Sequence, residues 1–389
     1  MEKEVSVEGL EKDISLVIRS FFDYLIFDFL SCKRQEKISL FSKMSSAEKK
    51  DKKADKEKKK HCEDSKVSPF KSSGYDMVPL QSDIANTAEL VDPKLVNPWG
   101  IVIEESNKSV WVADNGTGFL TNYKFDGHPN ATPVTIPGVG GATGTPSGLV
   151  LNETAGFVIS SGSNNSPSKL IIVSEDGTIS GFHPSVDPNN AIAVVSSPTK
   201  VFKGATLIGD FLFVTNFHDG VVEKYDSKWN LVGQFTDVAL TTAGYVPFGI
   251  AHIKKHLYVT FALQDPITLH DDVKGTGNGF IDIFDTEGSF IKRFANRGAL
   301  NSPWAVVAYH HHDDEVIFVG NFGDGKINVF DLKTGVFLSD LKDRFGNHIS
   351  IDGLWGLVLS PREHQKHPRT LFFSAGINSE GNGLFGKLR

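Results

Sequence analysis

One segment of the sequence combines several groups that could do chemistry. The stretch LQDPITLHDDVKGTGNGF, Leu263 to Phe280, carries Asp265, His270, Asp271 and Asp272 before a glycine-rich return. Carboxylates gathered in one loop suit Ca²⁺ or another divalent cation, which takes oxygen ligands, so Asp271 and Asp272 are the candidate metal ligands. A bound cation would activate water, with His270 or Asp271 as the candidate catalytic base.

Polar residues that follow other β-rich runs extend this set of candidate binding residues. They are Asp114, Asn115, Asn216, His218, Asp219, Gln264, Asp265, Asn321 and Asp324, together with Asn378. A second interpretation stays open for all of them, because Asp and Asn side chains also satisfy backbone groups in tight turns without any ligand.

Other catalytic chemistries leave no trace in the sequence. It contains no G-x-S-x-G elbow, H-E-x-x-H helix, phosphate-binding loop of the Walker type or C-x-x-C pair. Both cysteines, Cys32 and Cys62, precede the β-rich region, so that region uses neither disulfides nor thiolate metal sites. The formal net charge of −7 gives no basic footprint, and nucleic acid is therefore not an expected partner.

A recurring phrase indicates which elements position the candidate residues. NPWGI at Asn97 returns as TPSGL at Thr145, VPFGI at Val246, SPWAV at Ser302 and GLWGL at Gly353, and FKGATL at Phe202 is a degenerate copy. Each phrase precedes β-rich runs that end in polar turns. Six repeats of about four strands, with hardly a helix between them, predict an all-β fold, a six-bladed β-propeller.

The ring of blades has to close. The last repeat ends after its third strand, whereas YDMVPLQSD, Tyr75 to Asp83, is a spare strand ahead of the first repeat. We therefore expect this N-terminal strand to complete the sixth blade. The Gly or Ala of each phrase is expected to let neighbouring backbones approach closely around the axis. The aromatics Trp99, Phe248, Trp304 and Trp355 are expected to wedge between blades as core, or to form a ring at a ligand mouth.

Propeller geometry brings the candidate residues together. The loops that enter each innermost strand and the loops that join the second strand to the third emerge on one face, around the mouth of the channel. The sequence therefore predicts a polar mouth that binds a small molecule, a glycan or a protein segment.

The first part of the chain differs from the rest, and the predicted domains are a tail, 1–74, and a propeller, 75–389. Within the tail, LVIRSFFDYLIFDFL, 16–30, is apolar but interrupted by charges, which favours an amphipathic helix with peripheral membrane contact over a transmembrane span. The segment 48–61 carries eight lysines among four acids and predicts a disordered linker. We find no clear signal peptide, so a cytoplasmic or nuclear location is favoured over secretion, and Met1 and Met44 are alternative starts.

Several motifs together resemble a known family. DPKLVNPWGI, VWVADNGTG, SEDGTISGF, HDDVKGTGNGFIDIFD, LNSPWAVV, GNFGDGKINVFD and IDGLWGL are similar to those of an uncharacterised β-propeller family of bacteria and plants, related in architecture to NHL-repeat propellers. The resemblance spans roughly residues 76 to 389. It implies the six-bladed fold but no particular reaction.

Three functions are consistent with these patterns. The first is a binding propeller that uses its polar mouth. The alternative is a metal-dependent, lactonase-like hydrolase at the same mouth, and a further alternative is an interaction scaffold anchored by the tail. Whether the protein is an enzyme is left open by the sequence.

Overall fold

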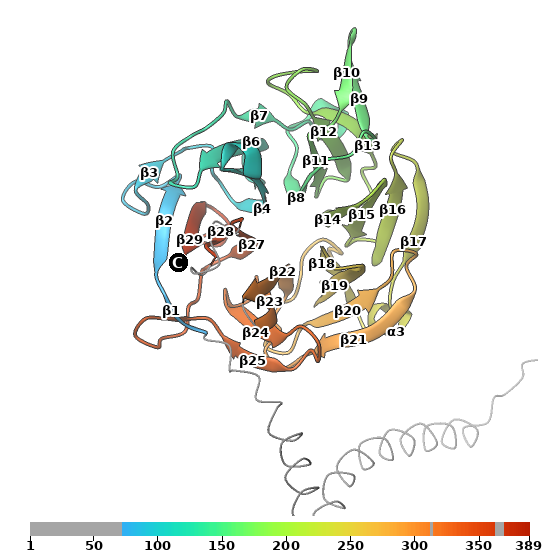
Figure 1. The fold of residues 1–389 in the computed structure, drawn as a ribbon. Helices are drawn as coiled ribbons and strands as arrows, with labels where there is room; N and C mark the ends of the chain where they lie inside the picture. Colours follow the sequence, from blue (N-terminus) through green and yellow to red (C-terminus); the bar gives the residue numbers. More distant parts are fainter. Residues whose placement is uncertain (1–71, 312–313, 362–368) are drawn as a thin grey trace, which may run out of the picture. The chain divides into compact units, whose positions relative to one another are not determined.

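The computed structural model describes residues 72–311, 314–361 and 369–389, and these residues form an almost purely β-sheet structure. Six sheets stand radially around a central axis, and each has four or five strands (Figure 1). The six-bladed β-propeller predicted from the repeats is therefore confirmed. The predicted helix, 16–30, and the predicted linker, 48–61, lie outside the described residues.

The first three blades follow one another along the chain, each from the axis to the rim. Blade 1 contains β4 (Pro98–Glu104), β5 (Ser109–Asp114), β6 (Phe119–Lys124) and β7 (Val134–Thr135). Blade 2 contains β8 (Pro146–Leu151), β11 (Leu170–Ser174), β12 (Thr178–Phe182) and β13 (Ile192–Ser196). Blade 3 contains β14 (Phe202–Ile208), β15 (Phe211–Asn216), β16 (Val221–Asp226) and β17 (Leu231–Phe235).

The last three blades repeat this order. Blade 4 contains β18 (Tyr245–Ile253), β19 (His256–Leu263), β20 (Phe280–Phe284) and β21 (Phe290–Asn296). Blade 5 contains β22 (Pro303–His311), β23 (Asp314–Asn321), β24 (Ile327–Asp331) and β25 (Phe337–Asp340). Blade 6 contains β27 (Leu354–Leu359), β28 (Leu371–Ala375), β29 (Leu384–Leu388), β2 (Met77–Ser82) and β3 (Leu90–Val91).

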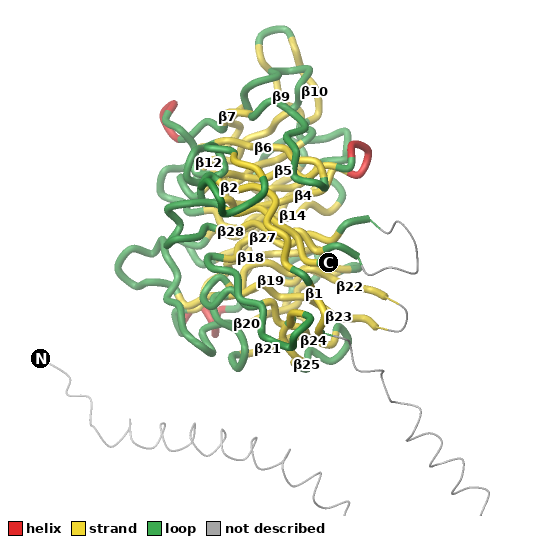
Figure 2. The backbone as a smooth tube through the Cα atoms, turned by 90° about the vertical axis from the view of Figure 1, so that its left-hand side faces the viewer, coloured by secondary structure: helices red, strands yellow, loops and turns green. Residues whose placement is uncertain are grey.

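A few short elements lie outside this pattern. The hairpin of β9 (Val158–Ser161) and β10 (Asn164–Pro167) projects from the rim beside blade 2 (Figure 2). The strand β1 (Ser73–Tyr75) pairs with β26 (Lys342–Asp343) next to blade 5. The helical turns are η1 (Glu105–Asn107), η2 (Val139–Gly141) and α3 (Val238–Thr242).

The ring closes as the sequence predicted. The N-terminal strand β2 pairs antiparallel with the C-terminal strand β29, so the two ends of the described chain share blade 6. The Ser82 hydroxyl donates to the Gly383 carbonyl at 2.7 Å, and the Gly383 amide donates to Asp83 at 2.8 Å. These bonds join residues about 300 positions apart, and they fix the seam of the ring.

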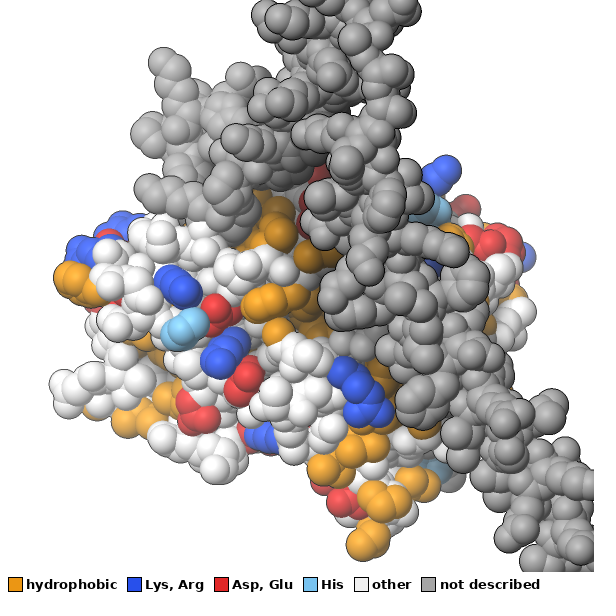
Figure 3. Space-filling view, turned by 90° about the horizontal axis from the view of Figure 1, so that it is seen from below, with side chains coloured by type: hydrophobic (Ala, Val, Ile, Leu, Met, Phe, Trp, Pro, Cys, Tyr) orange, Lys and Arg blue, Asp and Glu red, His pale blue; other side chains and the backbone are white. Residues whose placement is uncertain are grey.

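The apolar core is divided among the joints between blades. The buried hydrophobic side chains of the described residues form six clusters; five join two neighbouring blades, and the sixth, mainly from blades 5 and 6, also includes aromatic residues of blades 1, 3 and 4. Outer strands are less well covered, and Phe290, Ile291, Val336, Phe337 and Leu338 on and next to β21 and β25 are exposed. Figure 3 views the molecule from the side on which these strands lie, and apolar side chains are visible there among charged ones. The blades are thus held together face to face, not edge to edge.

Small residues let the inner strands crowd together. A Cβ atom added to Gly100 would lie 2.5 Å from the Ser147 carbonyl oxygen of the next blade, and one added to Gly249 would lie 1.9 Å from that of Trp304. A Cβ atom added to Gly356 would likewise lie 2.5 Å from the Trp99 carbonyl oxygen. Such distances exclude any side chain. The predicted reason for the recurring small residue is confirmed.

Candidate ligand site at the channel mouth

A stack of aromatic rings closes the channel at the end where the inner strands begin, which we call the mouth. Trp99 and Trp355 lie face to face with ring centroids 3.4 Å apart, and Phe322 stacks on Trp355 at 3.9 Å. Trp304 packs edge-on against both tryptophans, and Phe248 contacts Trp355 at 5.8 Å. These rings form the floor of the mouth.

The floor decides between the two placements expected for the aromatics of the repeated phrase, which were core wedged between blades or a ring at a ligand mouth. They are buried, but they contact one another on the axis and do not lie only between neighbouring blades. Trp99 and Trp304 belong to blades 1 and 5, which are not neighbours, and yet their centroids are 6.1 Å apart. The aromatic residue before the small residue therefore faces the channel in blades 1, 5 and 6, and the wide rings fill the space that the small residues leave open.

Lys203 occupies the same strand position in blade 3 as these aromatic residues do in blades 1, 4, 5 and 6. It precedes Gly204 as Trp99 precedes Gly100, and it is almost fully buried at 2% exposed. Its Nζ lies 5.0 Å from the Trp99 ring centroid and 5.5 Å from that of Phe217. A single change within the repeated phrase thus places an ammonium group beside the aromatic floor.

Glu175, which belongs to blade 2, neutralises the charge of Lys203. Its Oε1 forms a short ion pair with the Lys203 Nζ, and its Oε2 accepts a hydrogen bond of 2.7 Å from the Asn115 side chain of blade 1. Asn97 donates in turn to the Asn115 Oδ1 at 3.4 Å. A chain of polar contacts therefore runs around the mouth from blade 1 to blade 3.

The loop of blade 4, residues 264–279, extends over this network, and we call it the cover loop. His270 Nε2 lies 4.0 Å from the Glu175 Oε1, although blades 4 and 2 are not adjacent. Gln264 donates to the Phe217 carbonyl oxygen at 2.6 Å, and the Gly275 amide donates to the Asn301 Oδ1 at 2.7 Å. The loop is therefore anchored at both of its ends.

Asp272 is the carboxylate that the cover loop inserts most deeply into the mouth. Burial raises its pKa above the usual range, while Ser302, Lys203 and Lys274 partly oppose this shift. Its Oδ2 is buried and has no hydrogen-bonding partner among the described residues. A buried oxygen without a partner costs free energy, and a ligand could supply the missing hydrogen.

Two further charged groups complete the mouth. The Lys274 ammonium lies 3.8 Å from the centroid of the Phe322 ring. Burial also raises the pKa of Glu380 in blade 6, and the negative charge of Glu175 adds to the shift, while Asn97, Lys274 and Lys203 lower it. Glu175, Lys203 and Lys274 thus all contribute to the electrostatic environment of Glu380.

An unusual backbone positions Glu380. Asn378, Ser379 and Glu380 have φ angles of +55°, +54° and +65°, so three consecutive residues without glycine adopt the left-handed conformation. Each costs roughly 1 kcal/mol or more relative to ordinary backbone. The Asp352 carboxylate holds the turn by accepting from the Asn378 amide at 2.8 Å. Strain of this kind is found preferentially at functional sites.

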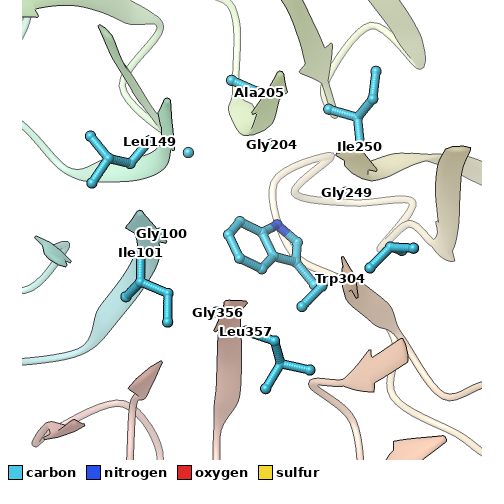
Figure 4. Close-up of a pocket in the computed structure, with 13 residues that line it drawn as sticks. Gly100, Ile101, Leu149, Gly204, Ala205, Gly249, Ile250, Trp304, Gly356 and Leu357 are labelled. Carbon is cyan, nitrogen blue, oxygen red and sulfur yellow. The ribbon is translucent and has the colours of Figure 1, made fainter. Parts of the chain in front are cut away.

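Below the floor, a cavity of about 110 Å³ occupies the axis. It is lined by the small residues of the inner strands and the residues that follow them, and the indole of Trp304 lies across it (Figure 4). The Trp304 Nε1 is buried and has no partner among the described residues. The mouth above is polar at its rim, whereas this cavity is bounded mainly by backbone and aliphatic groups.

The predicted binding residues fall into three groups in the structure. Asn115, His270 and Asp272 lie in the mouth. Asp114, Asn216 and Asn321 lie at the ends of second strands with no exposed surface, so they are parts of the blades. The others hold turns or the cover loop. Asp219, for example, accepts a hydrogen bond of 2.8 Å at its Oδ2 from the Asn216 side chain. This third group comprises His218, Asp219, Gln264, Asp265, Asp271, Asp324 and Asn378.

Four mouth residues were not predicted, namely Glu175, Lys203, Lys274 and Glu380. For Lys203 the signal was present, because FKGATL breaks the aromatic pattern at the position that faces the channel. Glu175 likewise directly follows a second strand, as Asn115, Phe217 and Phe322 do. Departures from the repeat, more than its typical turn residues, therefore mark the mouth.

A divalent cation fits this mouth poorly. The described residues contain no group of three or more His, Cys, Asp or Glu side chains that could hold a metal ion. Of the predicted ligands Asp271 and Asp272, the first is largely exposed and contacts His270 at 3.0 Å, and the second faces Lys203 and Lys274. Two ammonium groups would repel a cation placed between them.

Fold and mouth together define a six-bladed β-propeller with a charged, aromatic-floored channel entrance. The chain belongs to a family that includes uncharacterised proteins of Acanthamoeba polyphaga mimivirus. Protein R648 is 31% identical over 321 residues, covering 79% of this chain and 78% of the relative. Protein L690 is 33% identical over 310 residues, covering 76% and 81%. These relatives are viral, not the bacterial or plant proteins that the sequence motifs led us to expect.

Comparison of structures supports the architecture alone. The structure resembles that of a streptogramin B lyase with a TM-score of 0.50 and 11% sequence identity, over 81% of this chain and 97% of the other. No protein-family model matches the sequence. Among the described residues, no helix is long and apolar enough to cross a membrane.

Proposed function

We propose that the protein is a binding module that holds a small polar organic molecule at the channel mouth. The observation that carries this proposal is the convergence of Glu175, Lys203, Asp272, Lys274 and Glu380 on the aromatic floor. They come from blades 2, 3, 4 and 6 and from the loop that crosses between them. Charged groups so close together are costly to bury, and the repeat would place aromatic or turn residues there.

Ring closure does not require these groups. The seam depends on β2 and β29, and the blades are joined by their apolar clusters. The free Oδ2 of Asp272 and the left-handed turn at Glu380 instead cost stability. Binding of a ligand would offset both costs, which is typical of a site that is formed in advance of its ligand.

Tryptophan fluorescence tests the proposal directly, because Trp99, Trp304 and Trp355 lie in the floor. Titration of the full-length chain with a library of small polar molecules should give a saturable change with at least one of them. Lys203→Met should weaken that binding at least tenfold. Lys200→Met is the matched control, since Lys200 lies three residues earlier and pairs with Glu223 at 2.9 Å, away from the floor. Equal binding by both variants would contradict the proposal.

A second candidate function is acid–base catalysis at the same mouth. It is favoured by the raised pKa values of Asp272 and Glu380, because carboxyl groups with perturbed pKa values cluster in active sites. His270 and Asp271, in contact through Nδ1 and Oδ1, remain the catalytic candidates predicted from the sequence. Turnover of ester or lactone substrates that is lost in Glu380→Gln and insensitive to chelators would support a metal-free enzyme. Loss with chelator would instead support the metal-dependent hydrolase.

The remaining proposals rest on the sequence alone. They are the division into a tail, 1–74, and a propeller, 75–389, the anchoring role of 16–30, and the relation to NHL-repeat propellers. A chain lacking residues 1–43 should fold and bind as the full chain does if the tail serves only localisation. Altered ligand binding by that shortened chain would count against this division of labour.

A further inference from the structure

The aromatic faces of the mouth already carry cations. The Lys203 ammonium lies over Trp99 and Phe217, and the Lys274 ammonium lies 3.8 Å from the centroid of the Phe322 ring. An organic cation would need these same faces and would approach two fixed positive charges. The mouth is therefore poorly suited to a positively charged ligand.

An organic anion is also disfavoured. Glu175, Asp272 and Glu380 surround the two lysines, and Glu175 already occupies Lys203 through a short ion pair. A carboxylate or phosphate would have to displace Glu175 in order to pair with Lys203. Lys203 is thus already paired, and the three acids outnumber the two lysines, so the mouth does not favour an anion.

What the mouth offers is a close alternation of donors and acceptors. Acceptors are the free Oδ2 of Asp272 and the carboxylate of Glu380, and donors are the remaining hydrogens of Lys203 and Lys274. A hydroxyl group both donates and accepts, so neighbouring hydroxyls match such an array.

The floor adds two features that suit such a ligand. The indole Nε1 atoms of Trp99 and Trp355 are buried without partners among the described residues, and these residues are 2% and 1% exposed. The rings also bring apolar carbon atoms close to the lysines, because the Lys203 Nζ lies 5.0 Å from the Trp99 centroid and the Lys274 Nζ lies 3.8 Å from that of Phe322. Unpartnered donors next to apolar surface indicate a ligand with both oxygen atoms and a hydrocarbon frame.

We infer that the mouth binds a neutral polyhydroxylated molecule of monosaccharide size, with Asp272 and Glu380 accepting from its hydroxyls and Lys203 and Lys274 donating to them. This inference rests on the proposed function, because it names the ligand class of the same site. The cover loop would contact the ligand from above through Asp272 and Lys274.

The experiment is a set of fluorescence titrations of the full-length chain with probes that differ in charge. D-Glucose, D-galactose and myo-inositol represent neutral polyols, benzoate represents organic anions, and tetramethylammonium represents organic cations. We expect saturation by at least one polyol with a Kd on the order of 1 mM, and no saturation by either ion at similar concentrations.

Matched variants separate the mouth from the rest of the surface. Glu380→Gln leaves the Lys203–Glu175 pair intact and should weaken polyol binding at least fivefold, as should Asp272→Asn. Glu287→Gln changes an exposed acid at the rim that pairs with Lys224 at 3.2 Å, and it should leave the affinity unchanged. Thermal unfolding of each variant shows whether it is folded.

The outcomes distinguish the two proposals. Saturation by benzoate or tetramethylammonium but by no polyol would overturn the ligand class and leave the binding module standing. Polyol binding that survives both Glu380→Gln and Asp272→Asn would place the ligand elsewhere and overturn the inference. Failure of every probe at up to about 0.1 M, far above a millimolar Kd, would count against both.

Discussion

Trp99 and Trp355 stack face to face across the joint between the first and the last blade, with ring centroids 3.4 Å apart. The contact therefore lies beside the seam of the ring. The Ser374 hydroxyl supports it by donating to the Trp99 carbonyl oxygen and by accepting from the Gly356 amide at 2.9 Å. Stability of the ring and the shape of the mouth consequently depend on the same residues.

Removal of one ring of this stack should destabilise the whole propeller. Trp355→Ala leaves a cavity between Trp99 and Phe322, and we expect the free energy of unfolding to fall by about 3–5 kcal/mol. Urea unfolding followed by circular dichroism measures this change. Trp229→Ala, on the rim in contact with Phe157, is the control and should cost clearly less. A smaller loss for Trp355→Ala than for Trp229→Ala would contradict the role of the stack.

The close approach of inner strands predicts a sharp difference between two glycines. Gly249→Ala would bring a methyl group within 1.9 Å of the Trp304 carbonyl oxygen, and backbone cannot move aside without opening the ring. We expect a loss of at least about 3 kcal/mol in the free energy of unfolding, or no folded protein. Gly233→Ala, whose Cβ would meet its nearest neighbour at 3.9 Å, should be nearly neutral. Similar melting temperatures for the two variants would rule out the crowding argument.

Stability should depend on pH through Asp114. Burial raises the pKa of this carboxyl well above its usual range, and the nearby charge of Asp92 adds to the shift, while Thr121 lowers it. The folded state therefore binds its proton more tightly than the unfolded state does. Stability is highest below the unfolded pKa of about 4 and falls as pH rises, by up to ~1.4 kcal/mol per pH unit, until pH passes the folded pKa.

Asp114→Asn removes the titrating group and tests this sign. The stability difference, variant minus natural chain, should increase from pH 5 to pH 7 in urea unfolding experiments. Asp126→Asn changes an exposed turn residue whose pKa is lowered, chiefly by the His128 backbone amide, and it should show no such trend in this range. A difference for Asp114→Asn that is independent of pH would contradict the prediction.

The anchors of the cover loop should control its local opening. Gln264→Ala removes the side-chain bonds to the carbonyl oxygens of Phe217 at 2.6 Å and Leu269 at 3.2 Å. We expect faster amide hydrogen exchange in residues 264–272, by roughly tenfold for a loss of about 1.4 kcal/mol, and little change in the inner strands. Gln234→Ala, at the rim, is the matched control. Unchanged exchange in the loop would show that these bonds do not hold it.

The architecture was accessible from the sequence because a repeat imposes the same physical demand several times. Gly100, Gly249 and Gly356 stand where backbones almost touch, and a small residue recurs at this position in every blade, as Ala305 in blade 5 and as glycine in the others. The closing strand could be predicted because the last repeat lacks its fourth strand, whereas an extra strand precedes the first repeat. Even the degenerate phrase at Phe202 keeps its glycine.

The site was accessible only in part. Asp272 and His270 lie in a long insertion, which the sequence shows directly. Lys203 and Glu175 lie at ordinary repeat positions, and only the three-dimensional ring reveals that both face the channel and meet. Asp114, Asn216 and Asn321 are polar, as binding residues often are, but each is the last residue of its strand. The mouth residues come one position later, and these three side chains are buried within their blades. The side of a strand end that faces solvent depends on the bulge at each small residue. The position of this bulge cannot be deduced from the amino-acid sequence.

The seam in blade 6 also has a consequence for synthesis. The strand β2 leaves the ribosome before blades 1 to 5, but its partner β29 follows all the other described strands in the sequence. Until then Met77–Ser82 has only the short strand β3 as a neighbour, and such open edges are prone to pair with other chains. The strand β2 must therefore stay free of other partners until β29 has been made, so the ring can close only after the strands of the other five blades have been synthesised.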